Sequence, residues 1–286
     1  MSDASDDVLP DEWRWSCDLI LTATDGSPAS IHAVGWAARI AEDVPAELLT
    51  VYAFDADAEG AVADDEALRA AQERVERWCA AHGALGYGMR CSAVPGDPRT
   101  VLRDAIGKEQ PDLVVVGTRG GGGFPGLTVG SVTEWLAQLA TFPLAVVPAI
   151  ARTRTGGPIL AGVDGSERSD RALHWAIGLA GRLRRPVHAL HGMRWDETAV
   201  ARLRRAAVER QVDAAREHAR ALHVDLQLTE SVAHPVTALV ERARDDDAEA
   251  IVVGARGHGD FGELTIGRVP RQLLHVAPRP VIVIGA

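Results

Sequence analysis

Short apolar runs alternate along the chain with longer segments in which apolar residues recur at helical spacing. Runs such as LVVVG and VIVIG lack polar alternation, which is typical of strands buried on both faces of a sheet. The segment 64–82 instead carries charges along one side of a helical pattern. Strands that alternate with helices predict a parallel sheet joined by right-handed crossovers. The pattern therefore predicts an α/β fold.

The first half of the chain shows this alternation in full. Ser27 is a natural N-cap, and Pro28 suits the first position of the helix that follows the first strand. The expected elements are, in order, strand 18–24, helix 28–41, strand 47–54, helix 64–82, strand 86–94, helix 99–107, strand 112–118, helix 131–140 and strand 143–149. The second half repeats this order.

The repeat is also visible as sequence self-similarity. Asp164 follows Asp25 by 139 positions, and Gly254 follows Gly117 by 137. A lag that changes so little across a whole half indicates two duplicated domains rather than a solenoid of short repeats. The polar, glycine-containing segment ARTRTGGP forms the expected boundary. The predicted organisation is an N-terminal extension 1–16, a first domain 17–150, a linker 151–158 and a second domain 159–286.

Composition narrows the class of protein. The chain has 286 residues, is 47% hydrophobic and 24% charged, and has a formal net charge of −10. These values suit a globular protein with well-formed cores, and the negative charge disfavours nucleic acid and anionic membranes as partners. No apolar run approaches the ~18–20 residues that span a bilayer, and the acidic N-terminus does not resemble a signal peptide. We therefore expect a cytoplasmic protein.

Outside the glycine-rich segments, few residues have the spacing of a catalytic, redox or metal-binding site. The three cysteines, Cys17, Cys79 and Cys91, lack the spacing of a metal or redox motif, so we expect buried or indifferent thiols in a reducing compartment. The histidines lack metal-ligand spacing, so no metal-binding residue is predicted. Trp13 and Trp15 precede the first strand and are expected to cover an apolar edge.

A glycine-rich segment follows the fourth strand of each half. In the first half it reads GTRGGGGFPGLTVGSVTE, with seven glycines in residues 117–134. It begins after a buried strand and ends at a helix start, where amide groups and the helix dipole favour an anion. Glycine lets the main chain approach a phosphate without an intervening Cβ. Ser131 and Thr133 add hydroxyl groups, so the segment predicts a phosphate-binding loop.

The same spacing recurs in the second half, and each copy is paired with an Asp-Gly-Ser after the first strand. This combination is neither a Walker A loop nor a dinucleotide fingerprint. It resembles the ATP-binding pattern of the universal stress proteins in their tandem two-domain form. The resemblance implies two Rossmann-like (adenine nucleotide α-hydrolase-like) domains, each with a five-stranded parallel sheet in order 3-2-1-4-5. It also implies ATP, often with Mg²⁺, and final strands that pair to form a pseudodimer or a homodimer.

The resemblance also implies a set of nucleotide-binding residues. In the first half these are Ala23, Thr24, Asp25, Val51, Gly117, Thr118, Arg119, Gly120, Gly130, Ser131, Val132 and Thr133. In the second half they are Gly162, Val163, Asp164, Gly192, Gly254, Arg256, Gly257, Gly267 and Arg268. For Arg119 and Arg256, phosphate contact and salt bridging between the domains are both open.

The second half departs from the pattern at three positions. Arg268 replaces the hydroxyl residue Ser131, Pro270 replaces Thr133, and Gly192 is aligned with Val51 at the adenine side. Arginine is a good phosphate partner, yet its bulk can also fill the phosphate site. Whether the second site binds ATP therefore stays open.

These observations favour a regulatory protein that binds ATP and reports adenylate or stress status. Two alternatives remain. A slow ATPase or phosphotransfer enzyme would need a base aligned with a nucleophile, and no catalytic residue is identified. A scaffold protein would leave one or both nucleotide sites empty.

Overall fold

A computed structural model describes residues 15–55, 65–81, 88–120, 129–139, 141–149, 151, 156–192, 198–257 and 266–285. The first half contains β1 (Leu19–Ala23), α1 (Pro28–Asp43), β2 (Glu47–Phe54), α2 (Asp65–Ala80), β3 (Met89–Pro95), α3 (Pro98–Glu109), β4 (Leu113–Gly117), α4 (Ser131–Leu139) and β5 (Leu144–Val147). The second half contains β6 (Ile159–Gly162), α5 (Glu167–Leu183), β7 (Val187–Gly192), α6 (Ala199–Ala221), β8 (Leu226–Ser231), α7 (Pro235–Asp245), β9 (Ala250–Gly254), α8 (Arg268–Val276) and β10 (Val281–Ile284). This order confirms the predicted alternation.

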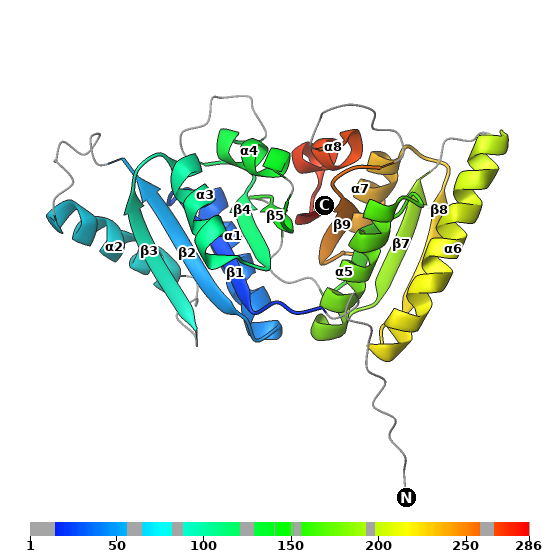
Figure 1. Cartoon of the computed structure of the whole chain (residues 1–286), viewed down its shortest axis with the longest axis horizontal. Helices are drawn as coiled ribbons and strands as arrows, with labels where there is room; N and C mark the ends of the chain where they lie inside the picture. The colour runs from blue at the N-terminus through cyan, green and yellow to red at the C-terminus, as the bar shows by residue number, and fades with distance from the viewer. Residues whose placement is uncertain are drawn as a thin grey trace, which may run out of the picture.

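The strands form one ten-stranded sheet that runs through both halves (Figure 1). Its order is β3-β2-β1-β4-β5-β10-β9-β6-β7-β8, so each half has the predicted order 3-2-1-4-5. All pairs within a half are parallel, whereas β5 and β10 pair antiparallel, with Val146 opposite Val281. The fold class is therefore confirmed, and the two domains form the expected pseudodimer through their final strands.

Helices cover both faces of the sheet. One face packs against α1, α2, α5 and α6, and the other against α3, α4, α7 and α8. Neighbouring residues of one strand enter different cores, as Ile20 and Leu21 show: both are 0% exposed, and they belong to opposite clusters. This two-sided burial explains why the strands read as continuous apolar runs.

Contacts outside the sheet also join the halves. Arg39 of α1 forms an ion pair with Glu249, which precedes β9, and Arg271 of α8 lies 3.4 Å from Glu134 of α4. Figure 1 shows α4 and α8 next to each other at the centre of the molecule. The two predicted phosphate-binding helices therefore start close to the domain interface.

Trp15 packs on the second half rather than on the strand that it precedes. Its ring lies edge-on to Trp175, with centroids 5.8 Å apart. A Cβ atom built on Gly178 of α5 would lie 2.3 Å from Trp15 Cγ, so this glycine makes room for the indole. Trp15 therefore packs against the apolar surface of α5, and Trp13 lies outside the described residues. None of the helices that the structure describes is long and apolar enough to cross a membrane.

Candidate nucleotide site

A cavity of about 280 Å³ lies at the carboxyl ends of the first-half strands. Its lining residues are Ala23, Thr24, Asp25, Ser30, Val51, Ala53, Pro98, Leu102, Val116, Gly117, Arg119, Gly120, Gly130, Ser131, Val132 and Thr133. The structure thus brings together every residue predicted for this site except Thr118. The Thr118 carbonyl instead accepts a hydrogen bond from the Gly130 amide at 2.7 Å, which holds the two ends of the glycine segment together.

Five of the residues that line the cavity were not predicted from the sequence. They are Ser30, Ala53, Pro98, Leu102 and Val116. Four of the five have apolar side chains, and none belongs to a glycine or Asp-Gly-Ser motif. The period-two pattern of the strands could have identified Ala53 and Val116, because each continues the face of a strand that ends at the site.

Asp25 is held at the mouth of this cavity by its own turn. Its Oδ1 atom accepts hydrogen bonds from the Ser27 amide at 3.0 Å and from the Ser30 hydroxyl at 2.7 Å. Gly26 has a φ of +76°, and its amide donates to the Thr24 hydroxyl at 3.2 Å. A left-handed glycine directly after the aspartate lets the chain turn sharply into α1. The carboxylate is therefore exposed but fixed in direction.

The glycines of the loop allow close packing within the protein itself. A Cβ atom on Gly117 would lie 2.7 Å from the carbonyl oxygen of Ala29, at the start of α1. One on Gly120 would lie 2.4 Å from the Asp25 carboxylate. The interpretation that these two glycines clear space for a ligand is therefore incomplete, because protein atoms already occupy that space. At Gly130 the nearest atoms would be 3.5 Å away, which is an ordinary contact. Residues 121–128 of the segment lie outside the described residues.

The start of α4 forms one wall of the cavity. Ser131 is exposed, as expected for a residue that faces a ligand. Thr133 is buried, and its hydroxyl donates a hydrogen bond to the Gly117 carbonyl at 2.8 Å. Thr133 therefore lines the cavity as predicted, while the proton of its hydroxyl joins α4 to the end of β4.

Arg99 brings a positive charge to the same wall. It lies in the first turn of α3, and its Nη2 atom donates to the Ser131 carbonyl at 3.3 Å. Sequence reasoning missed this residue because Arg99 and Ser131 are far apart in the chain and meet only in the folded domain. Arg119 lines the cavity as well, so two arginines border this site.

The second half repeats the loop scaffold. Oδ1 of Asp164 accepts from the Ser166 amide at 3.0 Å, and a Cβ atom on Gly257 would lie 2.2 Å from Oδ2 of Asp164. A Cβ atom on Gly254 would lie 2.8 Å from the Arg168 carbonyl oxygen. The Gly267 amide donates to the Ala255 carbonyl at 2.7 Å, as Gly130 does in the first half. Arg256 directly precedes Gly257 and is partly buried.

One predicted alignment between the halves is wrong. The amide of Thr24 donates to the Val51 carbonyl, and the amide of its counterpart Val163 donates to the Leu190 carbonyl, both at 3.0 Å. The ladder of parallel strands therefore makes Leu190, and not Gly192, the equivalent of Val51. Gly192 is two residues further along and matches Ala53.

Side chains fill much of the corresponding space in the second half. A Cβ atom on Gly162, the counterpart of Ala23, would lie 2.9 Å from Val253 Cγ1 and 3.2 Å from Leu239 Cδ1. One on Gly192 would lie 2.6 Å from the Cα atom of Pro235. The second domain thus has Gly162 and Gly192 where the first has Ala23 and Ala53. Neighbouring residues of the second domain occupy the space that the alanine methyl groups fill in the first.

The polar groups of the second half also differ. Arg268 is exposed where the first half has Ser131, Pro270 is buried where it has Thr133, and Val236 stands where it has Arg99. Among the residues that the structure describes, no three or more potential metal ligands lie together.

Comparisons with known proteins agree with this architecture. The sequence model of the universal stress protein family matches twice, over residues 18–148 and 157–285. A universal stress protein of Mycobacterium tuberculosis H37Rv is 30% identical over 296 residues, which covers 92% of this chain and 95% of that protein. A universal stress protein of Mycolicibacterium smegmatis is 29% identical and covers 93% of this chain and 96% of its own length.

A solved structure shares the fold over almost the whole chain. It is a universal stress protein from Archaeoglobus fulgidus, which superposes with a TM-score of 0.69 at 19% identity and covers 95% of this chain and 99% of its own. At this identity the likeness concerns the fold alone.

Proposed function

This chain belongs to the universal stress protein family, and from that premise we propose that its first domain binds ATP with Mg²⁺ and serves as a regulatory sensor of adenine nucleotide. The observation that carries the proposal is the first-half cavity, which joins an apolar pocket to a helix N-terminus. Sites at the carboxyl ends of parallel strands commonly hold nucleotides.

The two ends of the cavity suit different parts of ATP. Val51, Ala53 and Leu102 provide an apolar surface for a flat base. Asp25 can accept hydrogen bonds from ribose hydroxyls, because its carboxylate is exposed and fixed by Ser27 and Ser30. The α4 terminus with Ser131 attracts phosphate oxygens. Mg²⁺ prefers oxygen ligands and would be held mainly by the phosphates.

The proposal concerns binding rather than turnover. Asp25 is the only carboxylate among the described residues that line the cavity, and its Oδ1 accepts two hydrogen bonds within its own turn. A general base needs a carboxylate or imidazole aimed at the nucleophile. We therefore propose that the occupancy of the first site, and not the hydrolysis of ATP, carries the signal.

The second domain is proposed to bind nucleotide more weakly. Val253, Leu239 and Pro235 approach the positions where the first domain has the methyl groups of Ala23 and Ala53. The smaller space for the base weakens binding, and so does the replacement of Ser131 by Arg268 at the phosphate end.

Two measurements test the proposal. Purified protein is denatured, and mass spectrometry identifies any released nucleotide; stripped protein is then titrated with Mg-ATP in a calorimeter. We expect adenine nucleotide in the first experiment and saturable heat in the second. No nucleotide and no heat would refute the proposal.

A matched pair of variants locates the site. Ser131→Glu places a negative charge at the α4 terminus, where it suits the helix dipole but repels phosphates. Arg268→Glu makes the same side chain at the equivalent place in the second domain. We expect Ser131→Glu to abolish the main binding event and Arg268→Glu to leave it unchanged. Equal binding by Ser131→Glu and the parent would exclude this cavity.

A further inference from the structure

Two cysteines that are unremarkable in the sequence meet in the first domain. Cys79 lies in α2 and Cys91 in β3, and their Sγ atoms are 3.1 Å apart. Cys79 is 0% exposed, whereas Cys91 is partly exposed. All three cysteines are free in the structure, and Cys17 and Cys79 are buried as expected, but the contact between Cys79 and Cys91 was not predicted from the sequence. The third cysteine, Cys17, is buried before β1 and makes no thiol pair.

We propose that Cys79 and Cys91 are a redox-sensitive modification site, which hydrogen peroxide converts into an intramolecular disulfide. A disulfide bond is about 2.05 Å long, so the two sulfur atoms need to approach by roughly 1 Å. Both are free thiols in the structure. The proposal does not depend on nucleotide binding.

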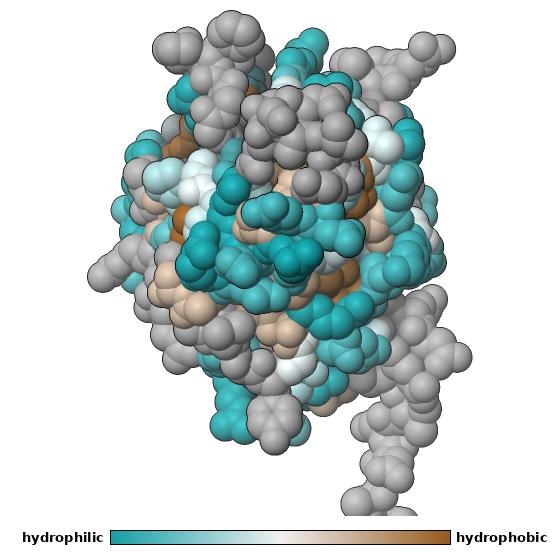
Figure 2. Space-filling model, turned by 90° about the vertical axis from the view of Figure 1, so that its left-hand side faces the viewer, coloured by the Kyte–Doolittle hydropathy of each residue, from teal (hydrophilic) through white to brown (hydrophobic). Residues whose placement is uncertain are grey.

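The geometry gives the two sulfurs different roles. Cys91 lies on the edge strand β3 and is partly exposed, whereas Cys79 is buried, so peroxide reaches the Cys91 sulfur first. This edge of the molecule faces the viewer in Figure 2, where the surface is mainly hydrophilic with separate apolar patches. The Cys91 thiol donates to Cys79, which lowers the pKa of the Cys79 thiol and raises the pKa of Cys91. Cys79 is therefore the better nucleophile, although it is buried.

The reaction follows in two balanced steps. The Cys91 proton shifts to the Cys79 sulfur, 3.1 Å away, and the Cys91 thiolate attacks peroxide. The O–O bond breaks, a sulfenic acid forms on Cys91, and the leaving hydroxide takes the proton from Cys79 to give the first water. The Cys79 thiolate then attacks the Cys91 sulfur, the S–S bond forms, and the sulfenic oxygen leaves as a second water with the two remaining protons. In total two thiols and one peroxide give one disulfide and two waters.

The pair lies in a part of the fold that borders the nucleotide cavity. Cys91 pairs with Thr50 in the sheet, directly before Val51 of the cavity wall. Trp78, next to Cys79, packs against Gly26: a Cβ atom on Gly26 would lie 2.2 Å from its ring. A covalent bond between α2 and β3 would therefore form beside the turn that orients Asp25.

The second domain has no counterpart of this pair. The ladder that joins Thr50 to Cys91 joins Ala189 to Leu228 in the second domain. Cys17 provides the internal control, because it is buried and lacks the thiol partner that Cys79 and Cys91 have in each other.

The test uses the full-length protein, reduced and then desalted. It is treated with hydrogen peroxide, quenched with an alkylating reagent in denaturant, and digested without reductant for peptide mapping. We expect free thiols to fall from three to one, a linked peptide pair that contains Cys79 and Cys91, and recovery of all three thiols after a dithiol reductant. Cys17→Ser should still form the linked pair, whereas Cys91→Ser should keep both of its thiols.

Several outcomes would overturn the proposal. They are a Cys91 sulfinic acid beside an unmodified Cys79, a disulfide between two chains, or undiminished thiols in the treated parent. Cys79→Ser introduces a buried hydroxyl and can impair folding. The test therefore depends on the parent peptide map and on Cys91→Ser, in which the changed side chain is partly exposed.

Discussion

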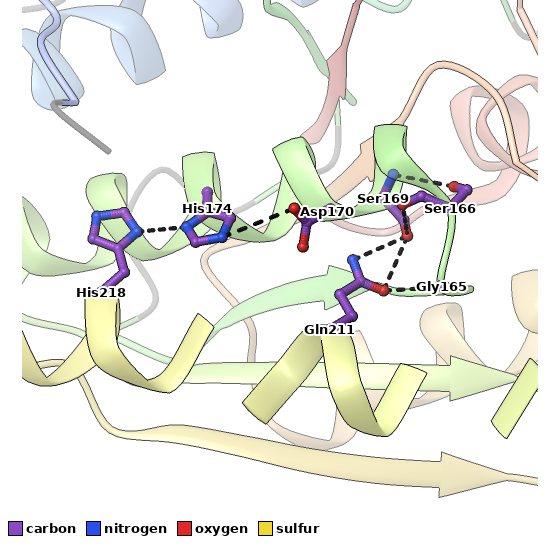
Figure 3. A network of polar contacts seen from close by, with 7 residues as sticks. All are labelled: Gly165, Ser166, Ser169, Asp170, His174, Gln211 and His218. Atoms are coloured by element: carbon purple, nitrogen blue, oxygen red, sulfur yellow. Dashed lines mark hydrogen bonds and ion pairs between the residues drawn. The ribbon is translucent and has the colours of Figure 1, made fainter. Parts of the chain in front are cut away.

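The turns that follow β1 and β6 have the same backbone conformation in the two domains, but different side chains hold them. Gly26 and Gly165 have φ values of +76° and +79°. In the first domain the Gly26 amide donates to the Thr24 hydroxyl, whereas in the second Val163 has no hydroxyl and the Gly165 amide donates to Gln211 of α6 at 3.0 Å (Figure 3). The shape of the turn is therefore maintained even where its hydrogen-bond acceptor comes from another helix.

The positions that face a ligand differ more than those that hold the loop. The contacts that would crowd a Cβ on Gly117 or Gly120 are reproduced at Gly254 and Gly257. Ser131 and Arg99, by contrast, become Arg268 and Val236. Within this chain, then, the packing of the glycine loop is shared and the surface toward the cavity is not. The glycines of the loop therefore have a structural role in both domains, whereas the residues that face the cavity differ and would determine binding.

The largest expected effect concerns the shared packing. Gly117→Ala and Gly254→Ala each force a methyl group against a backbone carbonyl, 2.7 Å and 2.8 Å away. Because a backbone cannot move aside as a side chain can, we expect each to lower the free energy of unfolding by about 3 kcal/mol, the upper part of the usual range for overpacking. Urea denaturation measures this.

Gly130→Ala is the control, since its new methyl group would meet atoms no nearer than 3.5 Å. If Gly117→Ala is as stable as Gly130→Ala and only loses nucleotide, the glycine serves the ligand and the packing argument is wrong.

The second prediction uses a histidine pair found in the second domain. Nδ1 of His174 lies 2.8 Å from Nδ1 of His218, and Asp170 lies 4.0 Å from His174 (Figure 3). Burial, and then the charge of His174, lower the pKa of His218 to about 4. An unfolded histidine titrates near 6.5. Between these values the unfolded state binds the extra proton, so stability is complete above about pH 6.5 and decreases as the pH falls.

We expect this linkage to remove about 2 kcal/mol of unfolding free energy between pH 7.5 and 5, since one pKa unit corresponds to about 1.36 kcal/mol. Urea denaturation at both pH values, on the parent and on His218→Leu, checks it. The variant should show a shallower pH dependence whatever its absolute stability. Parallel curves would show that His218 does not titrate in this way.

The sequence predicted the fold better than the site, for physical reasons. Buried strands such as 113–117 read as apolar runs, and the duplicated glycine pattern marks the loop in each half, so the architecture follows from local signals and the resemblance. Contacts between distant segments carry no such signal. Arg99 on Ser131, Thr133 on Gly117 and Cys79 on Cys91 arise only when the sheet brings the elements together. The wrong alignment of Gly192 with Val51 has the same origin, because the strand register is set by backbone hydrogen bonds and cannot be read from sequence similarity.

A third prediction exchanges the residues at the two helix starts. Ser131→Arg should weaken ATP binding in the first domain roughly tenfold, because a small hydroxyl donor is worth about 1.5 kcal/mol to a charged phosphate and the new side chain needs room. Arg268→Ser should strengthen binding in the second domain by less, since Val253 and Pro235 still restrict the base. Calorimetric titration of each variant and of the parent with Mg-ATP measures the change in affinity at each site. Loss of second-domain binding in Arg268→Ser would identify the arginine as a phosphate ligand.

The smallest expected effect tests whether Arg99 contacts phosphate. Its guanidinium is exposed and held only by the Ser131 carbonyl at 3.3 Å among the hydrogen bonds described for it, so salt screens its charge. We expect Arg99→Gln to weaken Mg-ATP binding by a factor of about three, within the ~0.2–1 kcal/mol typical of exposed charges. The matched control is Arg103→Gln, which removes the same charge one turn further along α3, where the side chain is 65% exposed beside Asp104. Titration with adenosine separates the two explanations, because a phosphate contact cannot affect a ligand without phosphate. Equal weakening of ATP and adenosine by Arg99→Gln would show that the residue acts by positioning α4, and equal weakening by Arg103→Gln would show only a general effect of charge.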